Sequence, residues 1–447
     1  MGFENDALKQ LEQLLGKAKA AGADAADAIF VSRTALSLSR RLGDLEQLER
    51  SESADLGLRV FVGKRQAIVS SSDTSPDTLD RLVDQAVTMA RVVPEDPFCG
   101  LADPALLATD NPDLDMTDDD EPSTEKLLDW AAQAEDAARA VPGVTNSEGA
   151  QASWSRNFVA LAASNGVARD YNATYHSLAV SVLAGTGTAM ERDYEYCSAV
   201  HAEDLKAPEE IGRLAGEKTV RRLNPKRVSS TQVPVVYDPR VSRTLIGHLA
   251  GAINGAAVAR GTTFLKDRMG ERIFPEGVSV IDDPRRRRGL RSKPSDAEGV
   301  RTERREVIEE GVLKTWFLDL RSARRLDLTT TGHASRGTSS PPSPSPTNLY
   351  LTPGAMNPTE LMADIAEGLY VTELIGFGVN NVTGDYSRGA AGFWIENGRP
   401  TYPVSEITVA GNLNQMFANL TAADDLEFRY GTDAPTIRVE GMTVAGR

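Results

Sequence analysis

Residues 239–261 have the sequence PRVSRTLIGHLAGAINGAAVARG, and their spacing predicts one helix from about 239 to 258. Its apolar residues recur at helical spacing and would face a core: Val241, Leu245, Leu249, Ala252, Ile253 and Ala256. Gly247, Gly251 and Gly255 lie four residues apart and therefore nearly in line. Each glycine costs a helix about 1 kcal/mol relative to alanine, which is tolerable where another backbone approaches closely. We interpret the line as a close-packing face, with a cavity wall as the alternative.

Around this helix, residues 230–447 contain more strand and turn signals than helix signals. A strand is predicted over 233–237, directly before the helix, and further strands over 304–310 and 312–318. Asn397-Gly398 is a strong hairpin signal. We therefore predict a C-terminal domain of mostly antiparallel β structure over 230–447.

Two smaller α+β modules are predicted before this domain. Their limits, 1–115 and 120–225, follow from the acidic stretch DNPDLDMTDDDEPS at 110–123, which is typical of a linker. In the first module, apolar and polar residues alternate on both sides of Gly43-Asp44, as in a hairpin, and a helix begins at Ser75-Pro76. The predicted fold class is α+β, with N-terminal α+β modules followed by the β-rich domain.

The composition is that of an acidic globular protein, with 40% hydrophobic residues, 25% charged residues and a net charge of −15. A negative excess of this size disfavours nonspecific binding to nucleic acid or anionic lipid. Cys99 and Cys197 stand far apart without CxxC spacing, which fits a reducing compartment. No apolar run reaches the length of a membrane span, so we expect a cytoplasmic protein with no membrane contact.

The segment LIGHLAGAINGAAVARG at 245–261 resembles the central helix of the TldD/PmbA metallopeptidase family. The similarity extends over essentially the whole chain. RSESADLGLRVFVGKRQAIVSSSD at 50–73 resembles the family's first domain. Two long stretches, TTTGHASRGTSSPPSPSPTNLYLTPG at 329–354 and NNVTGDYSRGAAGFWIENGRPTYPVSEITVAGNLNQMF at 380–417, resemble the core of its PmbA branch.

In the TldD branch of that family, the central helix carries a His-Glu-three residues-His motif, in which the histidines bind zinc and the glutamate acts as general base. The resemblance places the first histidine on Gly247, the glutamate on His248 and the second histidine on Ala252. A third ligand, a cysteine, falls close to Tyr430. A catalytic zinc needs about three His, Cys, Asp or Glu ligands, and these positions do not supply them. The resemblance therefore implies the PmbA (TldE) branch, with no metal ligand and no catalytic residue in this chain.

The same resemblance implies a subunit of a peptidase that degrades or processes unfolded peptides. In that arrangement zinc belongs to a TldD-type homologue, and this chain has no cofactor of its own. The chain would form a heterodimer with that homologue, or a homodimer with itself, and would shape the substrate chamber.

Four residues are candidates for contact with an extended peptide: His333, Asp385, Ser387 and Arg388. The last three lie in a stretch similar to the family's β domain near its peptide channel, where strand addition would hold a peptide whatever its sequence. Each has a plainer interpretation. The segment 385–389 is also typical of a turn before a core strand, and a lone histidine in a Gly/Ser/Thr context, such as His333, more often has no direct role; His248 is more often a helix histidine with satisfied hydrogen bonds.

A second function class remains open. The run PRRRRGLRSK at 284–293, with Arg285–Arg288 at its centre, is the sequence support for a regulatory protein that binds DNA gyrase or nucleic acid. A solvated loop that pairs with acidic neighbours or with a partner subunit is the plainer interpretation. A third possibility is a hydrolase with a site that uses no metal, but no GxSxG nucleophile elbow is present, and residue spacing does not single out a Ser/His/Asp site.

Overall fold

The computed structural model describes residues 4–446, so the predicted domain limits at residues 1 and 447 lie outside the described residues. The helices are α1 (Ala7–Ala20), α2 (Pro76–Val92), α3 (Thr124–Arg139), α4 (Pro208–Arg221), α5 (Pro239–Ala252), α6 (Gly255–Arg260), α7 (Leu320–Arg325), α8 (Pro358–Met362) and α9 (Leu413–Ala418). Within 4–446 no helix is both long enough and apolar enough to cross a membrane.

The strands of the N-terminal part are long: β1 (Ala25–Arg41), β2 (Asp44–Val62), β3 (Arg65–Ser71), β4 (Val144–Ala163), β5 (Ala168–Ala184) and β6 (Glu191–Ala199). The strands of the C-terminal part are mostly shorter: β7 (Thr231–Tyr237), β8 (Val280–Asp282), β9 (Arg305–Glu309), β10 (Val312–Leu313), β11 (Ala334–Ser335), β12 (Ser343–Pro344), β13 (Leu349–Leu351), β14 (Glu367–Ile375), β15 (Asp385–Glu396), β16 (Arg399–Asn412), β17 (Leu420–Ala422), β18 (Thr432–Asp433) and β19 (Ile437–Ala445).

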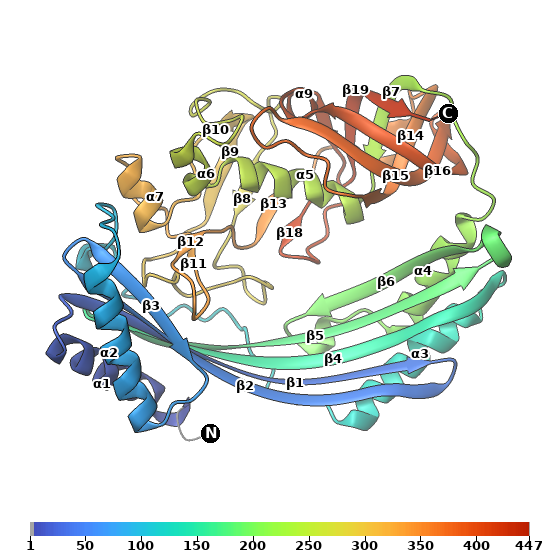
Figure 1. The fold of residues 1–447 in the computed structure, drawn as a ribbon. Helices are drawn as coiled ribbons and strands as arrows, with labels where there is room; N and C mark the ends of the chain where they lie inside the picture. The colour runs from blue at the N-terminus through green and yellow to red at the C-terminus, as the bar shows by residue number, and fades with distance from the viewer. Residues whose placement is uncertain (1–3, 447) are drawn as a thin grey trace.

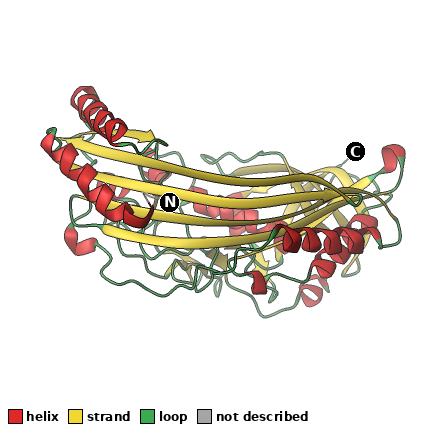
Figure 2. Cartoon of the chain, turned by 90° about the horizontal axis from the view of Figure 1, so that it is seen from below, coloured by secondary structure: helices red, strands yellow, loops and turns green. Residues whose placement is uncertain are grey.

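The N-terminal strands form one antiparallel sheet in the order β3-β2-β1-β4-β5-β6. The pairing of β1 with β4 joins the segments 1–115 and 120–225 in this single sheet. Even-numbered residues of β1 and β4, such as Phe30 and Trp154, pack under the helices, because side chains alternate between the two faces of a strand. Helices α1 and α2 cover one end of that face, and α3 and α4 cover the other end (Figure 2).

The C-terminal part lies over the opposite, concave face of this sheet (Figure 1). Here β7, β14, β15, β16 and β19 close into a ring, since β16 pairs with both β15 and β19. A second sheet has the order β10-β9-β8-β13-β18. Helix α5 contacts both sheets, and its Leu245 and Leu249 are fully buried in the core between them. The predicted class, α+β with mostly antiparallel sheets, is confirmed.

The helix predicted over 239–258 is in fact two helices. It begins as predicted at Pro239, but α5 ends at Ala252. Asn254 then caps α6 by accepting hydrogen bonds from two backbone N–H groups of that helix, and Gly255 N–H donates to the carbonyl oxygen of Phe317 at 2.8 Å. The apolar stripe continues through the break, so periodicity does not reveal it.

Two strand predictions in this part have different outcomes. The hairpin at Asn397-Gly398 is confirmed, because it joins β15 to β16 and both residues have positive φ. The strand predicted over 312–318 is wrong beyond β10. Its later residues leave the sheet, since Phe317 N–H donates to Ile253 O at 3.0 Å, at the break between α5 and α6.

Candidate functional site

One face of α5 is open to solvent. Gly247 and Gly251 are exposed, and a Cβ atom added to either would meet no other heavy atom within 4 Å. At Gly255 an added Cβ would lie 2.5 Å from Leu318 Cδ2 and 2.7 Å from Phe317 O. The close-packing interpretation is therefore right for Gly255 and wrong for Gly247 and Gly251, which form the floor of an open surface.

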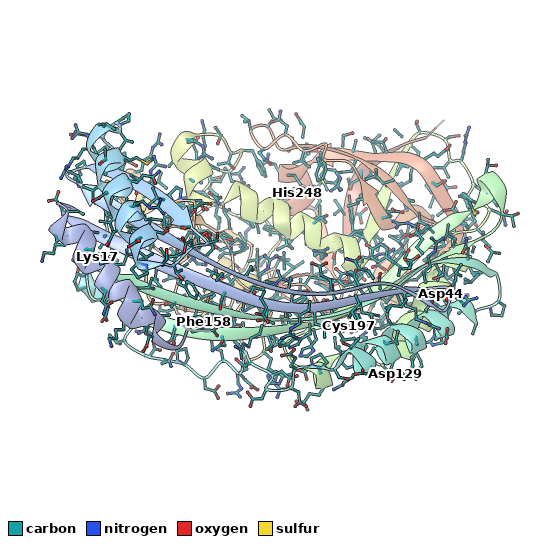
Figure 3. The ribbon with its side chains drawn as sticks, turned by 60° about the horizontal axis from the view of Figure 1, so that its bottom comes forward. Lys17, Asp44, Asp129, Phe158, Cys197 and His248 are labelled. Atoms are coloured by element: carbon teal, nitrogen blue, oxygen red, sulfur yellow. The ribbon has the colours of Figure 1, made fainter. Side chains whose placement is uncertain are left out.

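His248 lies on α5 at the edge of this floor, above the sheet that carries Phe158 and Cys197 (Figure 3). Its ring meets the ring of Tyr386, on β15, edge-on, with 6.0 Å between centroids. Burial, and after it the nearby Arg388 guanidinium, lower the pKa of His248 to about 4. The imidazole is therefore neutral at pH 7, and its Nε2 is enclosed without a hydrogen-bond partner among residues 4–446.

Two other positions that the resemblance aligns with zinc ligands lie apart from His248: Ala252 at the end of α5, and Tyr430 outside this helix. Ala252 is fully buried in the core. Tyr430 packs against Tyr196, with 5.3 Å between ring centroids, and the Arg243 guanidinium lies 4.3 Å from its ring centroid. Burial raises the pKa of Tyr430, so the phenol keeps its proton. Since Arg243 stands one helical turn before Gly247, Tyr430 lies toward the start of α5.

These residues do not fit a catalytic zinc. Such an ion needs about three His, Cys, Asp or Glu ligands, and His248 is the one such side chain among the four aligned positions. Within the described range, no three side chains of these types are grouped so that they could hold a metal ion. The guanidinium of Arg388, close enough to depress the pKa of His248, would also repel a divalent cation.

A groove of about 280 Å³ runs beside the first turns of α5. It is lined by α5 residues such as Arg240, Arg243 and Thr244, by Thr372–Leu374 of β14, and by Arg388. The positions 240, 243, 244 and 247 share one helix face. The three-residue spacing of Arg240 and Arg243 could have identified them from the sequence as neighbours on one face of the helix. The apolar stripe, which lies on the other side of the helix, does not reveal them.

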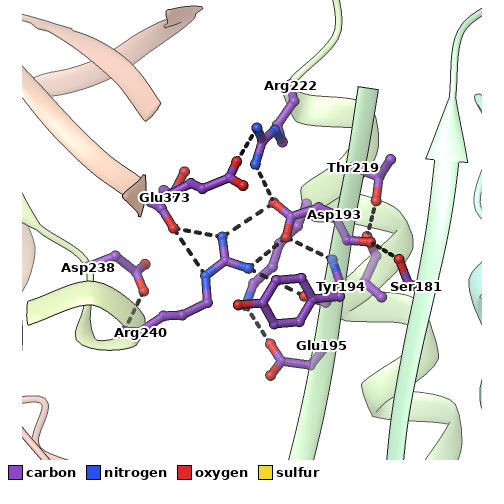
Figure 4. Close-up of polar contacts among 12 residues, drawn as sticks. Ser181, Asp193, Tyr194, Glu195, Thr219, Arg222, Asp238, Arg240 and Glu373 are labelled. Carbon is purple, nitrogen blue, oxygen red and sulfur yellow. Dashed lines mark hydrogen bonds and ion pairs between the residues drawn. The ribbon is translucent and has the colours of Figure 1, made fainter. Parts of the chain in front are cut away.

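The wall of this groove joins the two parts of the chain (Figure 4). Asp193 of β6 is 3% exposed and accepts hydrogen bonds from Arg240 Nη1 at 2.6 Å and from Arg222 Nη1 at 3.4 Å. Arg240 also donates to Thr372 O, and Arg222 pairs with Glu373 of β14. Burial opposes ionisation of Asp193, but Arg240 and Arg222 together hold its pKa below the usual range. The start of α5 is therefore fixed to the N-terminal sheet by a buried ionic network.

The four peptide-contact candidates do not lie together. Arg388 lines the groove, whereas Asp385 and Ser387 are exposed and alternate with it along β15, so they point to the other face of the strand. Asp385 there accepts hydrogen bonds from Thr383 and Asn412.

His333 is 3% exposed and lies outside the groove lining. Its ring packs on Phe317 at 4.6 Å, and its ring nitrogens contact Thr331 Oγ1 at 2.8 Å and Asp282 Oδ2 at 3.2 Å. These contacts satisfy both ring nitrogens of His333 within the chain and leave it no surface for a peptide.

The arginines of the 284–293 run are engaged within the chain. Their partners come from the acidic stretch 110–123 and from an aromatic ring: Arg285 with Asp110, Arg287 with Asp113, Arg288 with Asp115, and Arg286 over the ring of Phe428. The interpretation of this run as a loop that pairs with acidic neighbours is confirmed. Through these ion pairs, the acidic stretch 110–123 attaches the N-terminal part of the chain to the C-terminal part.

Comparison with protein families gives three matches to one family along the chain. The PmbA/TldA metallopeptidase domain 1 matches residues 26–90, the central domain matches 117–223, and the C-terminal domain matches 230–446.

Individual relatives agree over almost the whole length. The chain is 39% identical to the metalloprotease PmbA of Escherichia coli O157:H7 and 37% identical to a PmbA homolog of Haemophilus influenzae, with 95% of this chain and 93% of the relative covered in both cases. A crystal structure from Bacteroides thetaiotaomicron, named for modulation of DNA gyrase, superposes with a TM-score of 0.91 at 28% identity over 100% of both chains. TldE from Thermococcus kodakarensis has the same fold, with a TM-score of 0.87 at 20% identity over 98% of this chain and 100% of TldE. The chain therefore belongs to the TldD/PmbA metallopeptidase family, in its PmbA (TldE) branch.

Proposed function

We propose that this chain is the subunit without metal of a cytoplasmic two-subunit peptidase that degrades or processes unfolded peptides. The zinc and the general base belong to a TldD-type partner, and this chain supplies a wall of the chamber and contacts to the peptide. The observation that carries the proposal is the pair His248 and Arg388. A catalytic zinc would need about three ligands and no neighbouring cation. This site has one neutral imidazole, that of His248, beside the guanidinium of Arg388.

The free edge of β2 is the surface we propose for the partner. Residues 44–53 are exposed at every position, and β3 pairs with β2 only from Leu56 to Val62. An unpaired strand edge can add a strand from another chain, and Leu45 and Leu48 there are about half exposed, at 50% and 49%. A TldD-type subunit occupies this edge in the proposed heterodimer, and a second copy of this chain occupies it in the homodimer.

Reconstitution tests the proposed function. The purified chain alone should leave an unfolded peptide intact, and a mixture with a TldD-type homologue that keeps the His-Glu-three residues-His motif should cleave it. A Leu45→Lys/Leu48→Lys double variant should lose both the complex, seen by analytical ultracentrifugation, and the cleavage, because charge is placed where the edge must be desolvated.

Leu328→Lys is the matched control, since Leu328 is 48% exposed and does not belong to β2. It should assemble and cleave as the unaltered chain does. Cleavage by the chain alone would refute the proposal. Unimpaired assembly of the double variant would show that the β2 edge is not the subunit surface.

The alternative function, regulation of gyrase or binding to nucleic acid, gains no support from the site. Its sequence support was the Arg285–Arg288 run, and those side chains are held by Asp110, Asp113, Asp115 and Phe428. A loop with its charges neutralised inside the chain offers little attraction for phosphate.

A further inference from the structure

The groove beside α5 is cationic in an otherwise acidic chain. Four carboxylates line the groove or pair with its arginines, Asp193, Glu373, Glu148 and Glu191, against five arginines, which leaves one positive charge in excess: Arg192, Arg222, Arg240, Arg243 and Arg388. The whole chain carries a net charge of −15. Unpaired charges of one sign in a cleft raise the local concentration of ligands of the opposite sign.

Three of these arginines are already paired with carboxylates. Arg222 and Arg240 bind Asp193, and Arg192 pairs with Glu148 at 3.1 Å. The other two, Arg243 and Arg388, form no ion pair with a carboxylate in residues 4–446, although Arg243 is near enough to Asp433 to act against the burial that raises the pKa of that carboxyl. Arg243 donates to the carbonyl oxygen of Arg240 at 3.2 Å and covers the ring of Tyr430, and both of these partners are neutral.

The groups packed behind Arg388 do not neutralise it either. His248 is neutral because burial and Arg388 lower its pKa to about 4, and burial raises the pKa of Tyr386 to about 12. The Arg388 Nε atom is enclosed without a hydrogen-bond partner among the described residues. A polar atom buried without a hydrogen bond costs free energy, so the unpaired guanidinium favours a ligand that the chain itself does not supply.

The floor next to these arginines is open backbone. No side chain projects from Gly247 or Gly251, and nothing lies within 4 Å of the space that a Cβ atom would fill. The groove has a volume of about 280 Å³. This is room for the last residue of a peptide together with its carboxylate.

We propose that Arg388 and Arg243 form a binding site for a peptide carboxylate, so that a fixed guanidinium anchors the substrate in the groove beside α5. The site rests on the proposed function, in that it names the substrate group that this subunit recognises. Planar guanidinium groups bind carboxylates through two parallel hydrogen bonds. The carboxylate is that of the peptide C-terminus or of an internal Asp or Glu side chain.

Fluorescence anisotropy with the chain alone and labelled peptides tests this proposal without the partner subunit. A glycine- and alanine-rich peptide with a free C-terminal carboxylate should bind at least about tenfold more tightly than the same peptide as its C-terminal amide. A second pair, both amidated, carries one internal Asp or Asn. A preference within the first pair assigns the C-terminus, and a preference within the second pair assigns an acidic side chain.

Arg388→Gln and Arg243→Gln keep most of the length of the side chain and remove the charge, and each should reduce the preference for the carboxylate to near unity. Arg227→Gln is the matched control, since Arg227 is 56% exposed and pairs with Glu406 on the surface, and it should keep the preference. Equal binding of acid and amide forms in both pairs, or no binding of any peptide, would overturn the site. Neither result would bear on assembly or cleavage with a TldD-type partner, so the proposed function fails or stands separately.

Discussion

Replacing Asp27 by alanine should lower the free energy of unfolding by about 3–5 kcal/mol, because it leaves two buried guanidinium groups without their counter-ion. Asp27 of β1 is 2% exposed and binds Arg59 of β2, directly opposite in the register, and Arg336 of the C-terminal part. The side chain of Arg336 is fully buried and that of Arg59 is 4% exposed. Equilibrium urea unfolding measures the loss.

Asp80→Ala is the matched control for this substitution. Asp80 is 61% exposed and pairs with Lys17 on the surface, so its removal should cost less than about 1 kcal/mol. If the two variants unfolded at the same urea concentration, the buried cluster would not be the tie between the sheet and the C-terminal part that its geometry indicates.

The pH dependence of this loss has a definite sign. Burial opposes ionisation of Asp27, but Arg336 and Arg59 outweigh it and hold its pKa below the usual 3.8. Since the pKa in the folded state is lower than in the unfolded state, the stabilising contribution is complete above about pH 4 and is lost as the pH falls through the folded-state value. The difference between Asp27→Ala and the unaltered chain should therefore be constant near neutral pH and shrink in acid.

Asp193→Ala should have the second-largest effect, a loss of about 3 kcal/mol in unfolding free energy. It removes the carboxylate that holds Arg240, whose side chain is 9% exposed, at the start of α5. Arg222 retains Glu373 and Glu191, so Arg240 carries most of the cost. Amide hydrogen exchange in the first turn of α5 should become faster, because that turn loses its attachment to β6.

A double variant separates this cause from general disruption. Asp193→Ala/Arg240→Met removes the carboxylate together with the cation that it neutralises. It should be less destabilised than the sum of the single variants, with a coupling of roughly 1–3 kcal/mol. Strict additivity would mean that the two side chains do not depend on each other, contrary to their 2.6 Å contact.

Local patterns predicted the elements that position the site. The start of α5 at Pro239 and the hairpin at Asn397-Gly398 both depend on residues whose backbone preferences are strong by themselves. Local patterns did not predict the end of α5. There Asn254 caps a new helix, and Gly255 N–H donates to the carbonyl group of Phe317, more than sixty residues later. A sequence window does not contain that partner.

The site itself was predicted in part. The degenerate positions Gly247 and His248 do lie on the open face of α5, but the glycines there face solvent instead of a neighbouring backbone. Arg388 was among the peptide-contact candidates, whereas Arg243 and Asp193 were not. Their roles depend on β6, α5 and β15 meeting at one groove, which is a property of the tertiary structure.

Metal analysis of the purified full-length chain tests most directly whether this polypeptide works without its own zinc. Elemental mass spectrometry after exhaustive dialysis should find zinc far below one ion per chain, while a TldD-type homologue purified in parallel retains it. Zinc close to one per chain, lost on a His248→Ala substitution, would contradict the account, because it would place a metal centre on α5 beside the guanidinium of Arg388.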